Sequence, residues 1–383
     1  MNLPNNKKIG VIGAGQLGKM LAEAASPWNI KFNFLDAKNS PAERHADKFI
    51  TGNIKDKEDI KALCAISDIV TFEIEHIDSE TLFEVEKEGK KIFPLPSVLK
   101  IIKDKGIQKE FYKNNNIPVP HFVVIKEEKD WILHLDEFKG EEIVVKSCTG
   151  GYDGKGVEIT SKEKIKNGFR PFPTNNAMLE EKMEEMLEVS IIVAIDQKNN
   201  HLCYPPVVME FHPITNLVMF LHTETDLKQE IIEQCNKIAI QTAKSFHSPG
   251  LFAVELFIDK ENKVWVNEVA PRPHNSGHHT IEACYTSQYE QLNRILLGMP
   301  LGSTKLLCSA AMLNIVGADN FEGKYKIDNL ENILALEGVY IHMYDKSISK
   351  PARKLGHITV LANNREELFK KTELLRDIKV IPL

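Results

Sequence analysis

The segment Thr149-Gly150-Gly151-Tyr152-Asp153-Gly154-Lys155-Gly156 places four glycines within eight residues, soon after a strand-like run that ends at Lys146. Because glycine has no Cβ, such a segment can lay several backbone N–H groups against phosphate oxygens, while Lys146 and Lys155 supply charge. It is not a Walker A loop, because Gly156 follows Lys155 where Ser or Thr is required and a strand comes next. The pattern predicts a loop over a nucleoside triphosphate, and a glycine-rich β-hairpin without a ligand is the alternative.

Two glutamates lie on a predicted β-hairpin further along the chain. Strands are expected over 251–258 and 263–269, with a turn between them. If Asp259 lies opposite Val264, Glu255 lies opposite Glu268 on one face, where the two carboxylates repel unless a cation separates them. Hard oxygen ligands beside a phosphate site favour Mg²⁺. The alternatives are a pair of solvated glutamates or a different register. Asn267 would join the same face only through a bulge.

Two polar segments follow this hairpin. The first is Ala270-Pro271-Arg272-Pro273-His274-Asn275-Ser276-Gly277-His278-His279-Thr280, and the second is Lys350-Pro351-Ala352-Arg353-Lys354. We expect the first to hold a small anionic substrate and the second to close on a substrate phosphate. A zinc site on the three histidines is an alternative for the first segment, although it lacks the helical His-x-x-x-His spacing. A solvated charge run is the alternative for the second.

A second glycine pattern lies near the N-terminus. Gly13-Ala14-Gly15-Gln16-Leu17-Gly18 follows a predicted strand and opens a predicted helix, and Asp36 ends the next strand. These are the parts of a dinucleotide fingerprint, with glycines for the pyrophosphate and a carboxylate for the ribose. Taken alone, the pattern fits an NAD-dependent dehydrogenase equally well as a tight strand-to-helix turn that binds another anion or nothing.

The composition of the chain excludes several classes of protein. Its 383 residues, of which 43% are hydrophobic and 27% charged, suffice for two or three folded domains. A net charge of −6 offers no general attraction to nucleic acid or to an acidic membrane. Six widely spaced cysteines predict neither disulfides nor a structural zinc site, and they suit a cytoplasmic protein. No apolar run reaches the roughly 18 residues that span a bilayer, so no membrane partner is expected.

The order of the predicted elements divides the chain into three parts of mixed α/β and α+β structure. Residues 1–98 alternate strands and helices, which is typical of a Rossmann-like parallel sheet. Residues 99–300 are richer in strands and form an α+β domain. Residues 301–383 form a small C-terminal domain.

These motifs together resemble the ATP-grasp superfamily and, within it, the N5-carboxyaminoimidazole ribonucleotide synthases. The resemblance spans nearly the whole chain. Its motifs are the glycine patterns at 13–18 and 150–156, Asn267-Glu268-Val269-Ala270-Pro271-Arg272, His274-Asn275-Ser276-Gly277-His278 and Arg353-Lys354-Leu355-Gly356-His357. The resemblance implies an ATP-grasp fold with a lid subdomain at about 118–185, an N-terminal pre-ATP-grasp domain and a small C-terminal domain.

The same resemblance implies an ATP-dependent carbon–nitrogen ligase of de novo purine biosynthesis. ATP phosphorylates bicarbonate to carboxyphosphate, which yields CO2. The exocyclic amine of 5-aminoimidazole ribonucleotide captures this CO2 and becomes N5-carboxyaminoimidazole ribonucleotide. Burial of the site matters, because water would destroy carboxyphosphate.

The resemblance also assigns roles to individual residues. Asp153, Arg272 and Lys354 are implied to handle carboxyphosphate and the amine, and Glu255 and Glu268 to hold Mg²⁺. The implied nucleotide contacts are Lys105, Lys146, Gly151, Tyr152, Asp153, Gly154, Lys155, Gly156, Glu180, Glu181, Lys182, Met183, Glu188, His212, Asn267 and Glu268. The implied contacts of the aminoimidazole ribonucleotide are Gln16, Leu17, Tyr152, His274, Asn275, Ser276, Lys350 and Arg353.

Three hypotheses about function follow from the sequence. The first is the carboxylating ligase, expected to be a homodimer that uses ATP, Mg²⁺, bicarbonate and aminoimidazole ribonucleotide and binds neither NAD nor nucleic acid. The second is an NAD-linked oxidoreductase built on residues 1–98. The third is a non-catalytic nucleotide sensor, in which Glu268→Gln would leave any activity unchanged.

Overall fold

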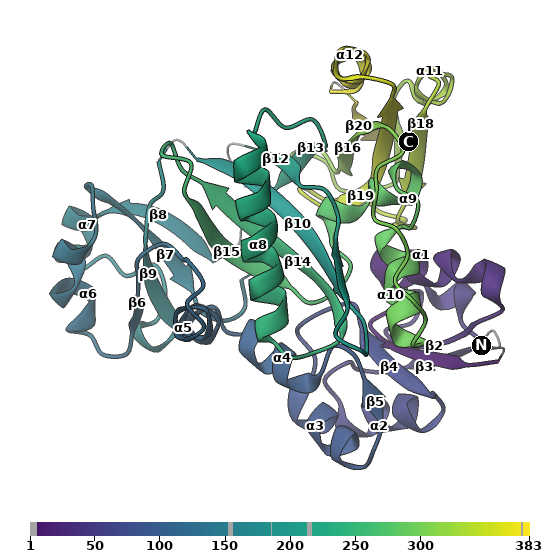
Figure 1. The fold of residues 1–383 in the computed structure, drawn as a ribbon, viewed down its shortest axis with the longest axis horizontal. Helices are drawn as coiled ribbons and strands as arrows, with labels where there is room; N and C mark the ends of the chain where they lie inside the picture. The colour runs from purple at the N-terminus through teal and green to yellow at the C-terminus, as the bar shows by residue number, and fades with distance from the viewer. Residues whose placement is uncertain (1–5, 152–155, 185, 213–216, 377) are drawn as a thin grey trace.

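The computed structural model describes residues 6–151, 156–184, 186–212, 217–376 and 378–383 (Figure 1). Its N-terminal part contains a five-stranded parallel sheet in the order β3-β2-β1-β4-β5, which confirms the predicted Rossmann-like arrangement. Its elements are β1 (Lys8–Ile12), α1 (Gln16–Ala24), η1 (Ser26–Trp28), β2 (Lys31–Asp36), η2 (Glu43–His45), β3 (Lys48–Thr51), α2 (Lys57–Ala65), β4 (Ile69–Phe72), α3 (Ser79–Lys87) and β5 (Lys91–Ile92).

The strand order of this sheet creates one position suited to a ligand. From β1 the chain continues to β2 on one side, whereas β4 lies on the other side of β1. The loops that follow β1 and β4 therefore meet at a topological switch point, where parallel sheets of this kind bind their ligands. The glycine pattern at 13–18 is one of these two loops.

Two helices lead from this part to a small antiparallel sheet. The lysine-rich sequence over 97–114 predicts one helical segment, whereas the structure has α4 (Pro96–Ile102) and α5 (Lys105–Asn114), separated where Asp104 caps α5. The small sheet has the order β6-β9-β7-β8 and lies to one side of the molecule in Figure 1. Its elements are β6 (Phe122–Ile125), α6 (Asp130–Leu133), η3 (Leu135–Glu137), β7 (Glu142–Ser147), β8 (Val157–Ser161), α7 (Lys162–Lys166), η4 (Thr174–Asn176) and β9 (Ala177–Glu181).

The largest element is a nine-stranded antiparallel sheet with the main order β15-β14-β10-β12-β13-β16-β19-β18, in which β11 pairs with β10. Its strands are β10 (Leu187–Ile195), β11 (His201–Cys203), β12 (Val207–Phe211), β13 (Val218–His222), β14 (Gly250–Ile258), β15 (Val264–Ala270), β16 (Ser309–Val316), β18 (Val339–Met343) and β19 (Lys354–Ala362). The remaining elements are α8 (Gln229–Ser245), η5 (Asn275–Gly277), α9 (Thr280–Ala283), α10 (Gln288–Leu296), β17 (Tyr325–Ile327), α11 (Leu330–Leu334), α12 (Arg365–Leu375) and β20 (Val380–Pro382).

Alternation along β14 distributes its side chains between two apolar cores. Phe252 and Val254 pack in the core that contains α8, as predicted, and Leu251 and Ala253 pack in the core that contains α10. On the face of β14 that packs against α10, Glu255 is the first polar side chain after Leu251 and Ala253.

The sheet runs without a break across the predicted boundary near residue 300. Strand β13 pairs with β16, and β16 pairs with β19. The C-terminal part therefore contributes three strands to the central sheet.

All six cysteines are free thiols. Among the residues that the structure describes, no helix has the length and apolar character needed to cross a membrane.

Candidate active site

The two predicted metal ligands lie where β14 and β15 pair. Glu255 is directly opposite Glu268 in the ladder, as predicted. The expected closing pair of the hairpin is wrong by one residue, because Ile258 and not Asp259 lies opposite Val264. A β-bulge next to Glu255 absorbs the difference, and Asn267 is its extra residue.

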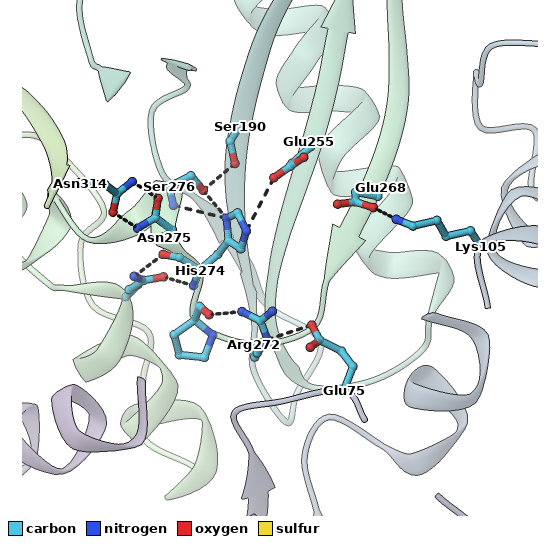
Figure 2. Close-up of polar contacts among 12 residues, drawn as sticks. Glu75, Lys105, Ser190, Glu255, Glu268, Arg272, His274, Asn275, Ser276 and Asn314 are labelled. Atoms are coloured by element: carbon cyan, nitrogen blue, oxygen red, sulfur yellow. Dashed lines mark hydrogen bonds and ion pairs between the residues drawn. The ribbon is translucent and has the colours of Figure 1, made fainter. Parts of the chain in front are cut away.

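The surroundings of the two glutamates shift their pKa values in opposite directions. Burial, Glu268 and Glu188 raise the pKa of Glu255, while the ammonium of Lys105 lowers the pKa of Glu268. Lys105 forms an ion pair with Glu268 (Figure 2). Two opposed carboxylates that already attract a cationic side chain are a donor set that suits a divalent ion with oxygen ligands.

The phosphate side of the site is a buried network of ions. Lys146 on β7 forms an ion pair with Glu180 on β9, and its Nζ donates to Asn267 Oδ1 at 3.1 Å. The bulge thus brings Asn267 to the site. The other oxygen of Glu180 lies 2.7 Å from Nζ of Lys109, and both side chains are only 2% exposed. Lys109 is one helical turn from Lys105 on α5, so the two lysines share a face.

This network carries more positive than negative charge. Burial lowers the pKa of Lys109 to about 8 even though Glu180 opposes the change. Burial favours the neutral form of Glu180 as well, but Lys109 and Lys146 outweigh it and lower the pKa of Glu180 to about 2. Two ammonium groups share one carboxylate here, so an anion such as a phosphate would complete the balance.

The other predicted nucleotide contacts do not all lie beside the two glutamates. Glu188 on β10 shares the face of Glu255, and burial raises its pKa to about 7. Glu181 lies 3.5 Å from Lys139, and Lys182 forms an ion pair with Glu142, so these two side chains pair with neighbours on the small sheet. Met183 and His212 lie in irregular segments after β9 and β12, and Gly151 and Gly156 flank the glycine loop. Tyr152, Asp153, Gly154 and Lys155 lie outside the described residues.

The polar loop after β15 bends back over the acidic pair. His274 Nε2 lies 3.6 Å from Glu255 Oε1, and His274 Nδ1 lies 2.9 Å from Ser276 Oγ. Ser276 Oγ in turn lies 2.7 Å from Ser190 Oγ. Figure 2 shows Lys105 and His274 approaching the two glutamates from opposite sides.

Further contacts fix the ends of this loop. The guanidinium of Arg272 lies 2.8 Å from Glu75, which belongs to the N-terminal part. The side-chain amides of Asn275 and Asn314 exchange two hydrogen bonds, of 2.8 and 2.9 Å. The loop is therefore held by residues from both neighbouring parts of the molecule.

The N-terminal glycine loop is engaged by the protein's own carboxylates. The N–H groups of Gly15 and Gly18 donate to the two carboxylate oxygens of Glu73, which follows β4, and Ala14 N–H donates to Asp36 Oδ2 at 2.7 Å. A Cβ on Gly13 would lie 2.7 Å from Glu73 Cγ, which explains the glycine there. The fingerprint groups that a dinucleotide would use are thus internally paired, which disfavours the dinucleotide interpretation.

Comparison with known proteins assigns families to the three parts. Residues 6–103 match the ribonucleotide synthetase preATP-grasp domain, residues 110–289 the ATP-grasp domain, and residues 310–371 the phosphoribosylaminoimidazole carboxylase C-terminal domain. The N5-carboxyaminoimidazole ribonucleotide synthase of Staphylococcus haemolyticus is 35% identical over 94% of each chain. The chain belongs to the N5-carboxyaminoimidazole ribonucleotide synthase family, with an ATP-grasp fold.

Solved structures of this synthase family agree with that assignment. The enzyme of Thermotoga maritima is 38% identical, with a TM-score of 0.88 over 98% of this chain and 100% of that one. The Aspergillus clavatus synthase in complex with ADP and 5-aminoimidazole ribonucleotide is 30% identical, with a TM-score of 0.88 over 97% of this chain and 98% of that one.

The synthase residues predicted in the C-terminal part divide into two groups. Lys354 begins β19, and its charge acts on Glu255 across the site. Lys350 instead forms an ion pair with Glu322 at 2.8 Å, and Arg353 Nη1 donates to the carbonyl oxygen of Ile348 at 3.0 Å. Gln16 and Leu17 open α1 beside the contacts of Glu73.

Several residues of this candidate site were not predicted from the sequence. Glu73 and Glu75 follow β4, and the topological rule for adjacent parallel strands could have pointed to them. Lys109 could have been found from its helical spacing to Lys105. No local signal marks Ser190, Gln288 or Asn314, because only the tertiary fold brings them to the loop.

Proposed function

We propose that the protein carboxylates 5-aminoimidazole ribonucleotide with ATP and bicarbonate, giving N5-carboxyaminoimidazole ribonucleotide, ADP and phosphate. The observation that carries the proposal is the pairing of Glu255 with Glu268, with Lys105 and Lys146 on one side and the loop of His274 on the other. Nucleotide and acceptor can meet at such a site. The family membership supports the same reaction.

The bonds that form and break in this reaction indicate which groups particular residues must bind. A bicarbonate oxygen bonds to the γ-phosphorus while the bond to ADP breaks, which gives carboxyphosphate. Its carbon–oxygen bond then breaks, phosphate leaves with the electron pair, and the exocyclic amine bonds to CO2 and loses a proton. Lys105 and Lys146 bind the phosphate oxygens, and Arg272 with Lys354 holds the carboxyl group.

A metal ion would be held by Glu255 and Glu268. Mg²⁺ held there would supply positive charge against the phosphates. Lys105, which pairs with Glu268 here, would then be available to a phosphate oxygen. The proposal extends to Asp153 and Tyr152, whose contribution rests on the resemblance of the glycine loop.

The test of the function is the dependence of ADP release on each substrate. We expect ADP and phosphate only when ATP, Mg²⁺, bicarbonate and 5-aminoimidazole ribonucleotide are all present. Turnover with glycinamide ribonucleotide and formate would instead indicate a formyl transfer. Saturable fluorescence changes on titration with NADH would favour the oxidoreductase hypothesis.

Location and assembly are also part of the proposal. A homodimer in the cytoplasm is expected from the family resemblance and from free cysteines that suit a reducing compartment. Sedimentation of the purified protein measures its state of association.

A further inference from the structure

Three imidazoles in a row, called the stack below, join the central domain to the C-terminal strands; the rings of His342 and His357 are within 10° of parallel, and those of His278 and His357 are tilted by 34°. The ring of His357 on β19 lies 4.6 Å from the ring of His278 and 4.5 Å from that of His342 on β18. His278 is 2% exposed and His357 is fully buried. His278 and His357 belong to the two sequence motifs that the proposed reaction does not use in full, and His342 was not predicted.

Each ring also has a polar partner. Tyr344 Oη lies 2.8 Å from His357 Nδ1, and Tyr289 Oη lies 3.0 Å from His278 Nδ1. Nε2 of His342 lies 2.7 Å from a carboxylate oxygen of Glu282. Among the described residues, no group of three or more His, Cys, Asp or Glu side chains is arranged to hold a metal ion, and these three imidazoles are no exception.

The neighbour Gln288 shows which nitrogen of His278 carries the proton. Gln288 Oε1 accepts the N–H of His274 at 2.9 Å, and Gln288 Nε2 donates to the carbonyl oxygen of His274 at 2.8 Å. These two bonds fix the orientation of the amide, so its Nε2 faces His278 Nδ1 at 3.2 Å. Since an amide nitrogen only donates, His278 Nδ1 must accept, and the ring is neutral with its proton on Nε2.

The stack therefore lies between two parts of the proposed active site. At one end, Gln288 ties His278 to His274, which faces Glu255. In the middle of the row, His357 lies three residues beyond Lys354 on the same strand. The contact between the rings of His278 and His357 therefore joins the loop of His274 to the strand of Lys354.

We propose that His278 and His357 are positioning residues, whose neutral rings hold β19 and its Lys354 against the substrate loop 274–278. The proposal rests on the proposed function for its substrate. It goes beyond that function because neither ring needs to touch the reacting atoms.

The surroundings keep the rings neutral. Burial lowers the pKa of both His278 and His357 well below the usual value, and the ring of His278 lowers the pKa of His357 further. The groups facing His278 and His357 are His274, His279, His342, Lys354, Tyr289 and Tyr344, and Glu282 faces His342. Because the unfolded histidines bind protons below about pH 6.5 and the buried ones resist them, acid weakens this interface.

Two substitutions of His357 separate positioning from mere support. His357→Ala removes the ring, and we expect KM for aminoimidazole ribonucleotide to rise about ten-fold or more, with KM for ATP within about two-fold of the wild type. His357→Phe keeps a ring that cannot be protonated. In this variant, KM for aminoimidazole ribonucleotide should return to within about three-fold of the wild-type value at about pH 8. Between about pH 8 and about pH 6, this KM should rise less in the variant than in the wild type. His201→Phe on β11, outside the interface, is the matched control.

Two outcomes would overturn the proposal. One is that His357→Phe is as impaired as His357→Ala, and the other is that both KM values rise together. If His357→Ala does not fold, ¹⁵N-histidine spectra of the wild type decide, because a protonated Nδ1 on His278 at neutral pH contradicts the assignment of its proton to Nε2. The spectra need no turnover. A wild type without substrate-dependent ADP release would therefore refute the function and leave the stack testable.

Discussion

Glu255 shows how a single residue can trade stability for function. Burial and two nearby carboxylates raise its pKa, so its ionised form is disfavoured in the folded protein. The unfolded carboxyl ionises at the ordinary value of about 4.3, and stability is lost as pH rises from there through the raised folded pKa. Glu255→Gln should remove that loss, so we expect a higher melting temperature than the wild type in metal-free buffer at neutral pH.

The same substitution should abolish turnover. Loss of one proposed metal ligand is expected to lower kcat/KM by about a hundred-fold or more. Thermal melts from about pH 5 to 8 test the stability prediction. A wild type and a Glu255→Gln variant with parallel stability profiles would contradict it.

Lys109 is the residue whose loss should damage the fold most directly. It pairs with Glu180 where both side chains are 2% exposed. Lys109→Met leaves that carboxylate with one cation, and breaking a buried ion pair costs about 3–5 kcal/mol. Denaturant unfolding measures the change. Lys139→Met removes an exposed pair with Glu181 and should cost less than about 1 kcal/mol.

A double variant identifies the cause of the loss. If an unpaired charge on Glu180 destabilises Lys109→Met, adding Glu180→Gln should recover part of the stability. Equal stability of the single and double variants would show that lost packing, not charge, explains the effect.

At the scale of elements, the start of α5 links helix formation to nucleotide binding. Asp104 caps this helix by accepting the N–H of Ile107 at 3.0 Å, and Lys105 N–H donates to the carbonyl oxygen of Cys148 at 2.8 Å. Asp104→Ala should cost about 1 kcal/mol and raise KM for ATP, because Lys105 loses its fixed position. Asp56→Ala removes the cap of α2 at a similar cost in stability. It should leave KM for ATP unchanged, and equal KM values in both variants would refute the link.

The hairpin of β14 and β15 shows which features of a structural element could be predicted from the sequence. Alternating apolar residues predicted both strands and the buried face, and the pairing of Glu255 with Glu268 followed from an assumed turn register that is wrong by one residue but is compensated by the bulge. The turn register was missed by one residue, because a bulge has no reliable signature in a single sequence. Glu180 was expected to contact the nucleotide, and its buried ion pair with Lys109 was not predicted, because Lys109 comes from a helix distant in sequence.

At the scale of the molecule, the strand order of the central sheet could not be predicted from the sequence. Local patterns predicted the strands of the C-terminal part but not that β16 pairs with β13. Pairing between distant strands depends on tertiary packing, which propensity does not encode. The same limit applies to the stack of His278, His342 and His357, which three separate segments supply.

The continuity of the sheet predicts that the C-terminal part is needed for folding. A chain of residues 1–308 would lose β16, so β13 would become an exposed edge with unpaired backbone groups. Phe220 and Leu221, which are 3% and 0% exposed, would meet water, and Asn275 would lose Asn314. We expect this fragment to aggregate or to bind a hydrophobic dye without a cooperative melt, whereas the full chain melts cooperatively. A soluble fragment 1–308 that melts in one transition and binds ATP would show instead that the C-terminal strands are an accessory, and Lys354 would then act from a separable unit.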